Sequence, residues 1–143
     1  MPYDPNLVRP MKEELTRIGV EELLNAEQAN TALNEKSGTT LLVVNSVCGC
    51  AAGNARPGVE MALQHRILPD RSYSVFAGQD LEATTAARSF LHGYPPSSPA
   101  IALFREGELV MMLERKDIEG HSAIDVGQAM MIAFDQHCTP QPS

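Results

Sequence analysis

Residues 39–53 of the chain are TTLLVVNSVCGCAAG, an apolar run followed by two cysteines one residue apart. The run Thr39–Asn45 shows no alternation of apolar and polar side chains, which is typical of a strand covered on both faces in an α/β sheet. Ser46–Gly53 is small and polar, and a helical pattern begins at Ala51. These residues therefore predict a buried strand that leads, through a cysteine-containing corner, into a helix.

The same patterns extend the α/β prediction to both sides of this corner. Further strands are predicted at 73–77, 100–104 and 109–113, the last two forming a hairpin. Helices are predicted at 10–19, 21–34, 51–65 with a kink at Pro57, 81–91 after an Asp80 cap, and 123–137 after a Ser122 cap. This order predicts a mixed central sheet with helices on both faces and extra N-terminal helices.

Length and charge set the organisation and exclude some partners. The 143 residues suit a single domain at 1–143, with an N-terminal helical extension at 1–38 and a flexible tail at 139–143. The 11 basic and 18 acidic side chains give a net charge of −7, which argues against nucleic acid or an anionic membrane surface as partner. No apolar stretch is long enough to span a membrane and the N-terminus is polar, so we expect a cytoplasmic protein, monomeric or weakly dimeric.

Cys48 and Cys50 are the candidate catalytic residues. The first turn of a helix presents unpaired N–H groups, which favour the nucleophilic thiolate form of a cysteine. Because Cys48 is the outermost thiol at the corner, we assign it as the nucleophile and Cys50 as the resolving thiol. A disulfide between them would close a small ring, which predicts a labile catalytic bond, and Gly49 would permit the backbone torsions of that ring. Arg56, one to two helical turns further on, is an auxiliary source of positive charge.

Two other interpretations of the Cys-Gly-Cys sequence stay open. Cys-x-Cys pairs bind soft metals such as Cu(I) or Zn, but a closed zinc site needs four ligands. The chain has three Cys and four His, and His137 and Cys138 are the only obvious recruits; we assign no metal ligand. The remaining interpretation is a pair of inert packing thiols.

Cys138 has two interpretations of its own. It ends a helical stripe of Val126, Met130 and Phe134 at a spacing of four residues, which favours a half-buried packing residue. The alternative is an auxiliary thiol that pairs with another chain or with a low-molecular-weight thiol.

Pro99 stands directly before the predicted strand at 100–104. A trans proline at the first residue of a strand is the ordinary expectation, since few X–Pro bonds are cis. A cis Ser98–Pro99 bond would turn the backbone of Ser98 outward beside the cysteine corner, where its N–H and C=O groups could pair with an extended substrate. Ser98, Pro99 and Gly49 are therefore the candidate substrate-binding residues.

Six features occur together in the chain: NSVCGCAAG at 45–53, ARP at 55–57, FAGQD at 76–80, PSSP at 96–99, IEGH at 118–121 and the terminal Cys138. Jointly they resemble the bacilliredoxins, thioredoxin-like bacterial proteins with a Cys-Gly-Cys motif. The resemblance implies a thioredoxin fold in which Pro99 is a cis proline facing the active site. It also implies removal of bacillithiol from mixed disulfides on proteins, with weak isomerase or reductase action on protein disulfides. Cys48 would attack the bacillithiolated protein and take up the thiol, and Cys50 would resolve the adduct.

The sequence therefore predicts a thioredoxin-like thiol–disulfide oxidoreductase. We expect no bound cofactor, because a low-molecular-weight thiol of the bacillithiol type serves as cosubstrate. The expected partners are client proteins that carry mixed disulfides, together with that thiol or a partner reductase that supplies reducing equivalents.

Overall fold

The apolar run at 39–45 forms the middle strand of a five-stranded mixed sheet in a computed structural model that describes residues 2–139. The strands follow the order β1-β3-β2-β4-β5 across the sheet. They are β1 (Glu21–Glu22), β2 (Thr39–Asn45), β3 (Arg71–Phe76), β4 (Ala100–Arg105) and β5 (Glu108–Leu113). β3 is parallel to both β1 and β2, whereas β4 is antiparallel to β2 and to β5. The predicted hairpin therefore joins the sheet beside β2.

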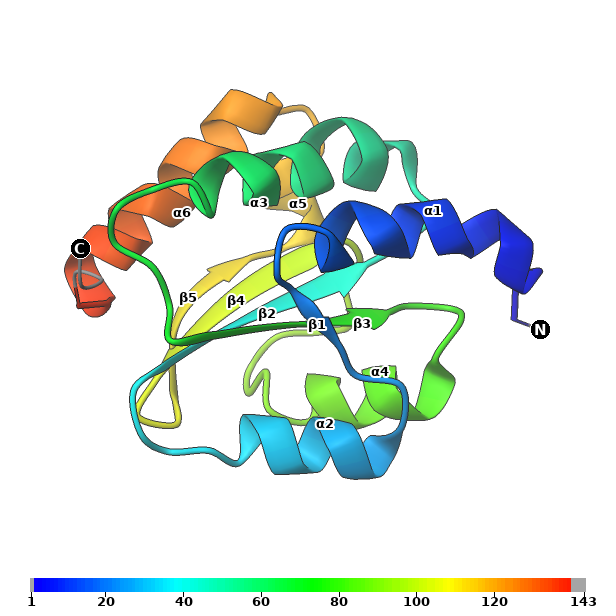
Figure 1. Ribbon diagram of the computed structural model, residues 1–143, viewed down its shortest axis with the longest axis horizontal. Coiled ribbons are helices and arrows are strands. Elements are labelled where there is room, and N and C mark those ends of the chain that lie inside the picture. The colour runs from blue at the N-terminus through cyan, green and yellow to red at the C-terminus, as the bar shows by residue number, and fades with distance from the viewer. Residues whose placement is uncertain (1, 140–143) are drawn as a thin grey trace.

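Helices cover both faces of this sheet (Figure 1). α1, α3, α5 and α6 lie on one face, while α2 and α4 lie on the other. The helices are α1 (Pro5–Thr16), α2 (Ala26–Leu33), the π-helical turn η1 (Ala51–Ala55), α3 (Arg56–Ala62), α4 (Leu81–Arg88), α5 (Arg115–Ile118) and α6 (Ala123–His137). The mixed sheet with helices on both faces agrees with the fold class that the sequence predicts.

The absence of alternation in β2 follows from these two layers. Leu41 and Val43 pack into the core under α1, α3 and α6, whereas Leu42 and Val44 pack into the core under α2 and α4. All four side chains are at most 1% exposed. Burying each of them stabilises the fold by roughly 1.5–3 kcal/mol, so β2 is anchored from both sides. The chain that follows β2, from Ser46 on, therefore starts from a fixed position.

The N-terminal region differs from its prediction in two ways. α1 begins at Pro5, where the Asp4 side chain accepts a hydrogen bond from the Asn6 N–H at 2.9 Å, and Pro10 lies inside the helix. Asp4 and Pro5 together are the stronger start signal. Pro10 has no N–H to donate to the carbonyl of Asn6, four residues earlier, but Asn6 is exposed and its carbonyl can bind water. Glu21–Glu22 forms the edge strand β1 and is not helical. The predicted helical extension at 1–38 therefore contributes a strand to the sheet.

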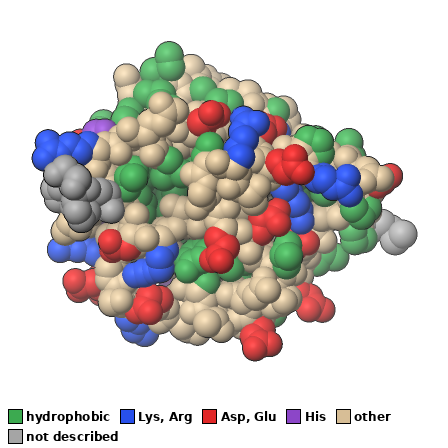
Figure 2. All heavy atoms as spheres, in the orientation of Figure 1, with side chains coloured by type: hydrophobic (Ala, Val, Ile, Leu, Met, Phe, Trp, Pro, Cys, Tyr) green, Lys and Arg blue, Asp and Glu red, His purple; other side chains and the backbone are tan. Residues whose placement is uncertain are grey.

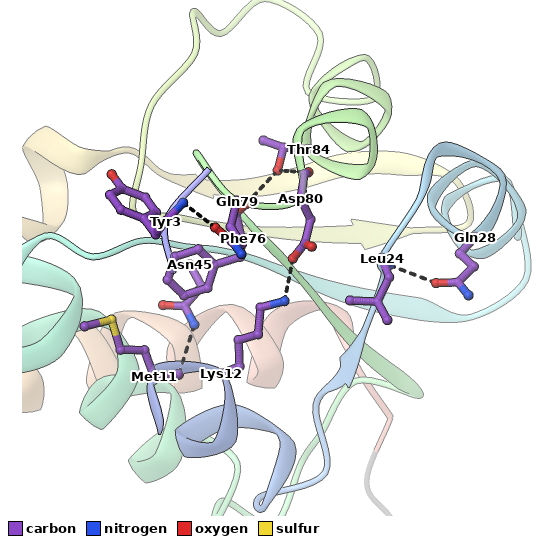
Figure 3. A network of polar contacts seen from close by, with 10 residues as sticks. All are labelled: Tyr3, Met11, Lys12, Leu24, Gln28, Asn45, Phe76, Gln79, Asp80 and Thr84. Atoms are coloured by element: carbon purple, nitrogen blue, oxygen red, sulfur yellow. Dashed lines mark hydrogen bonds and ion pairs between the residues drawn. The ribbon is translucent and has the colours of Figure 1, made fainter. Parts of the chain in front are cut away.

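Of four further expectations, two meet a different outcome, one is confirmed and one lies almost wholly outside residues 2–139. The kink assigned to Pro57 is replaced by the π-helical turn η1, directly before that residue. Asp80 precedes α4 but does not cap it with its side chain, because its carboxylate binds Lys12 of α1 at 2.7 Å (Figure 3). The predicted tail is described only at Thr139, which is exposed, and residues 140–143 lie outside the described part. The Ser122 cap of α6 is confirmed as a capping box with Asp125.

The surface carries both signs of charge. On the face that Figure 2 shows, acidic and basic side chains are interspersed among apolar ones, so this face has no continuous basic surface. Within residues 2–139, no helix has the length and apolar character that crossing a membrane would require.

Candidate active site

Cys48 and Cys50 lie at the carboxyl end of β2, where the chain turns into η1 and α3. The Cys48 carbonyl accepts hydrogen bonds from the N–H groups of Ala51 at 2.9 Å and Ala52 at 3.2 Å, so helical bonding begins at Cys48. The two cysteines form a disulfide with a Cα–Cα distance of 5.3 Å. Cys48 is half-buried, whereas Cys50 is 8% exposed. An incoming molecule therefore reaches Cys48 more easily than Cys50.

One backbone N–H group donates a hydrogen bond to the sulfur of Cys48. The Cys50 N–H donates to Cys48 Sγ at 3.3 Å, and the Cys48 N–H donates to Ser46 Oγ at 3.2 Å. A hydrogen bond from an amide favours the charged form of an acceptor sulfur. The same amide would favour a thiolate at Cys48 in the reduced protein, and the assignment of Cys48 as the nucleophile stays a prediction.

Gly49 does not play the conformational part that its position suggested. Its φ lies outside the left-handed range that other glycines of the chain adopt. It is exposed, and a Cβ at this position would meet nothing within 4 Å. The closed ring therefore needs no torsion that is special to glycine, and the small residue instead leaves open space beside Cys48.

The loop before Cys48 is fixed by Asn45, Ser46 and Arg56. Asn45 Oδ1 accepts from the Ser46 N–H at 2.9 Å and from Arg56 Nη1 at 2.9 Å. The same Nη1 donates to the Ser46 carbonyl at 2.9 Å. Asn45 Nδ2 donates to the Met11 carbonyl at 3.2 Å, which ties the end of β2 to α1 (Figure 3). The hydrogen bonds of Arg56 thus go to the loop that carries Cys48.

Sequence analysis missed Asn45, Ser46 and Glu14, whose carboxylate pairs with Arg56 Nε at 3.3 Å. Two signals were present. Asn45 is a polar residue that directly follows a buried apolar strand, and Arg56 stands three and six residues before the buried Val59 and Ala62, on the inward face of α3. Both positions call for a polar partner inside the fold.

The candidate substrate-binding residues Ser98 and Pro99 come to the same end of the sheet. The Ser98–Pro99 peptide bond is cis, which confirms that implication of the family resemblance. Val44 of β2 pairs with Ala100, the first residue of the antiparallel strand β4. The residues just before β4 therefore lie beside the residues that follow Val44. Pro99 is buried and Ser98 is half-buried. The register therefore brings the cis proline next to the loop that carries the cysteines.

Cys138 lies at the other end of the molecule. It ends α6, where its N–H donates to the Phe134 carbonyl at 2.8 Å, and its thiol contacts Thr39 at the start of β2. β2 is about 20 Å long at roughly 3.3 Å per residue, so this thiol is remote from Cys48. Val126, Met130 and Phe134 are buried, as the packing interpretation expects. Burial also raises the pKa of the Cys138 thiol, which favours its unreactive protonated form.

The metal interpretation of the cysteine pair finds no ligand set. Within residues 2–139, no group of three or more His, Cys, Asp or Glu side chains is arranged to hold a metal ion. Two thiolates alone cannot complete the tetrahedral coordination of a structural zinc site.

The sheet order, the cysteine pair at the start of a helix and the adjacent cis proline together define a thioredoxin-fold protein for thiol–disulfide redox chemistry. Two solved structures share the fold. Mitochondrial thioredoxin 3 of Saccharomyces cerevisiae in its oxidised form has a TM-score of 0.55 at 13% identity, over 86% of this chain and 98% of that chain. The thioredoxin of Malassezia sympodialis has a TM-score of 0.55 at 15% identity, over 83% and 90%.

Sequence comparison identifies the family. A family model described as disulphide isomerase matches residues 3–138. The chain is 52% identical to a bacilliredoxin of Koribacter versatilis, over 95% of this chain and 94% of that protein. It is 44% identical to a bacilliredoxin of Staphylococcus aureus, over 95% and 93%. The chain belongs to the bacilliredoxin family.

Proposed function

We propose that this protein removes low-molecular-weight thiols of the bacillithiol type from mixed disulfides on client proteins. The observation that carries the proposal is the unequal exposure of two sulfurs within bonding reach. Cys48 is accessible and accepts a hydrogen bond from an amide, whereas Cys50 is 8% exposed directly behind it. An accessible nucleophile with a sheltered second thiol suits a substrate disulfide that approaches from solvent.

The first step transfers the small thiol to Cys48. The Cys48 thiolate attacks the sulfur of the small thiol in the client mixed disulfide. A new Cys48–thiol disulfide forms, the client S–S bond breaks, and the client cysteine leaves as a thiolate that takes a proton from water. The step is a thiol–disulfide exchange: one disulfide breaks, another forms, and the client cysteine is returned to its reduced form.

The second step releases the small thiol. Cys50 loses its proton and attacks Cys48 Sγ, which forms the Cys48–Cys50 disulfide and expels the small thiol as a thiolate. The described structure is this oxidised state. Two equivalents of a low-molecular-weight thiol, or a partner reductase, then return both cysteines to the reduced form.

Ser98 and Pro99 are the proposed docking edge for the client chain. Ser98 directly precedes the buried Pro99, just before β4 begins. Its backbone groups would pair with an extended segment that carries the modified cysteine. Gly49 leaves open space on the other side of Cys48. The same arrangement would accept a protein disulfide, so weak isomerase or reductase action is part of the proposal.

A Cys50→Ala variant tests the assignment of roles. Incubation with a bacillithiolated client should release the reduced client and leave one bacillithiol on Cys48, detected by intact mass and located by peptide mapping. The matched control is Cys138→Ala, which should turn over normally and keep no adduct. An adduct on Cys138, or none on Cys48, would contradict the proposed function.

Metal analysis separates this function from a soft-metal carrier. Protein purified without chelator should contain well under one equivalent of Cu or Zn, and Cys48→Ser should not change that content. Stoichiometric metal that disappears in Cys48→Ser would support the carrier and count against the redox proposal.

A further inference from the structure

Arg56 is a buried cation next to the redox corner, and the mechanism above does not use it. Its side chain is 3% exposed. Arginine keeps its charge in proteins, and burial of a charge is costly unless hydrogen bonds and a counter-ion compensate for it. The contacts of Arg56 therefore show what the fold gains by holding this charge here.

Those contacts lead to Cys48. Nη1 donates to both Asn45 Oδ1 and the Ser46 carbonyl at 2.9 Å, and Ser46 Oγ in turn accepts from the Cys48 N–H at 3.2 Å. Apart from Arg56 itself, every group in this chain of hydrogen bonds belongs to residues 45–48, where β2 ends and the corner begins. A shift of the guanidinium would therefore move the backbone on which Cys48 is carried.

The counter-ion comes from a different element. Arg56 Nε finds no hydrogen-bond partner among the described residues but lies 3.3 Å from Glu14 Oε1 of α1. Glu14 is 33% exposed, so water screens its charge more than that of Arg56. The charge of Arg56 is therefore only partly neutralised by its counter-ion.

We propose that Arg56 is a positioning residue for Cys48, whose buried charge also favours the Cys48 thiolate. The proposal rests on the function proposed above, because it concerns the nucleophile of that reaction. A neutral donor could satisfy both acceptors of Nη1, and an apolar side chain would avoid the desolvation cost altogether. A buried cation has the further property that it stabilises a developing negative charge nearby, and Cys48 is where the mechanism needs one.

Charged residues of α1, α4 and α5 also lie near the corner. On the Ser98–Pro99 side, Arg88 Nη2 of α4 donates to the Ser97 carbonyl at 3.4 Å. The Arg115 N–H of α5 donates to Ser97 Oγ at 2.7 Å, and the Arg115 guanidinium is paired with Glu119 at 2.7 Å.

On α1, Glu14 opposes Arg56 and Lys12 is neutralised by Asp80 at 2.7 Å. From the segment before α6, His121 approaches η1 with its backbone, since its carbonyl accepts from Asn54 Nδ2 at 2.6 Å. Because a substitution at Arg56 leaves these other charges in place, a resulting change in the ionisation of Cys48 is assigned to Arg56.

The test follows alkylation of Cys48 by iodoacetamide in the fully reduced protein from pH 5 to 10, with the labelled peptide resolved by mass. For Arg56→Gln, which keeps a donor and loses the charge, the midpoint of the profile should rise by about one pH unit. Arg56→Lys, which keeps the charge, should restore most of that shift. The matched control is Arg17→Gln, since Arg17 pairs with Glu60 at 3.8 Å between the same two helices but at an exposed site.

The outcomes decide the proposal in each case. An unchanged midpoint in folded Arg56→Gln, or an equal shift in Arg17→Gln, would overturn it. If Arg56→Gln does not fold, Glu14→Gln replaces it: loss of the negative charge should lower the midpoint, and a constant or higher midpoint would overturn the proposal. Alkylation needs no client, so a failed client assay with a shifted profile would refute the proposed function and leave this inference standing.

Discussion

Substitution of Gly58 by Ala should loosen the contact that seats α3, the helix after the cysteine corner, on α6. An added Cβ would lie 2.7 Å from Val126 Cγ1, 2.8 Å from Val126 Cβ and 3.1 Å from the Ala123 carbonyl oxygen. Val126 is 2% exposed, so its side chain has no free space to enter. The two helices must therefore move apart.

The size of the effect follows from two opposing terms. Overpacking of a close-packed core costs about 1–3 kcal/mol. Contacts as short as 2.7 and 2.8 Å argue for the upper part of this range, about 2–3 kcal/mol, and the better helix propensity of Ala returns ~1 kcal/mol. The net loss is about 1–2 kcal/mol of unfolding free energy. With ~2.1 cal/mol/K of unfolding entropy per residue and 143 residues, this loss lowers Tm by about 3–7 °C.

Gly127→Ala is the matched control on the facing helix. Its Cβ would lie 2.8 Å from Met61 Sδ, near the flexible end of a half-buried side chain that can swing away, although the Gly58 carbonyl is also close at 3.2 Å. We expect a loss below ~1 kcal/mol, since a flexible methionine adapts to a new neighbour. Thermal unfolding of the oxidised proteins, followed by circular dichroism, measures both values. A Gly58→Ala protein that melts at or above Gly127→Ala would refute the argument.

Two further predictions concern the cysteines and their support. Because burial raises the pKa of the Cys138 thiol, iodoacetamide should label Cys138 more slowly at pH 7.5 than it labels Cys48, and Cys138→Ser should keep full turnover. A thiol pKa that is raised in the folded protein contributes stability below the pKa of the unfolded protein, and this contribution is lost as pH rises through the folded pKa. The fall in Tm above pH 8 should therefore be smaller in Cys138→Ser than in the unsubstituted protein. An unchanged slope of Tm against pH would contradict this prediction. Asn45→Ala removes the hydrogen bonds to the Met11 carbonyl of α1 and to Arg56 Nη1 of α3, and leaves Nη1 with the Ser46 carbonyl alone. This loss should cost about 2–3 kcal/mol in urea unfolding and slow Cys48 adduct formation; wild-type values of both would count against the anchoring role.

Local patterns predicted most of the fold. The apolar run at 39–45 is a strand because both faces of β2 are covered, and the stripe from Val126 to Phe134 is the buried side of α6. Glu21–Glu22 could not be predicted in this way. These two acidic residues become a strand only because they pair with Tyr73 and Ser74 of β3, a contact that their own sequence does not signal.

The site likewise contains residues that a local signal predicts and contacts that it does not. Cys48 and Cys50 were found because the signal is local: two cysteines where a strand leads into a helix. The Arg56 contacts could not be found, because they depend on α1, the end of β2 and α3 meeting at one point. Such a meeting is decided by packing over long sequence distances, whereas spacing along the chain reports only what lies within one element.

Two cysteines at opposite ends of one strand show why position in this fold decides reactivity. Cys138 is held beside the start of β2, where burial disfavours its anion. Cys48 follows the end of β2, where an amide N–H points at its sulfur and a buried guanidinium supports the loop beneath it. In α/β sheets the carboxyl ends of strands are where helices begin and N–H groups remain free for a substrate. We therefore expect thiol chemistry at only one end of the sheet, although the chain places a thiol at each.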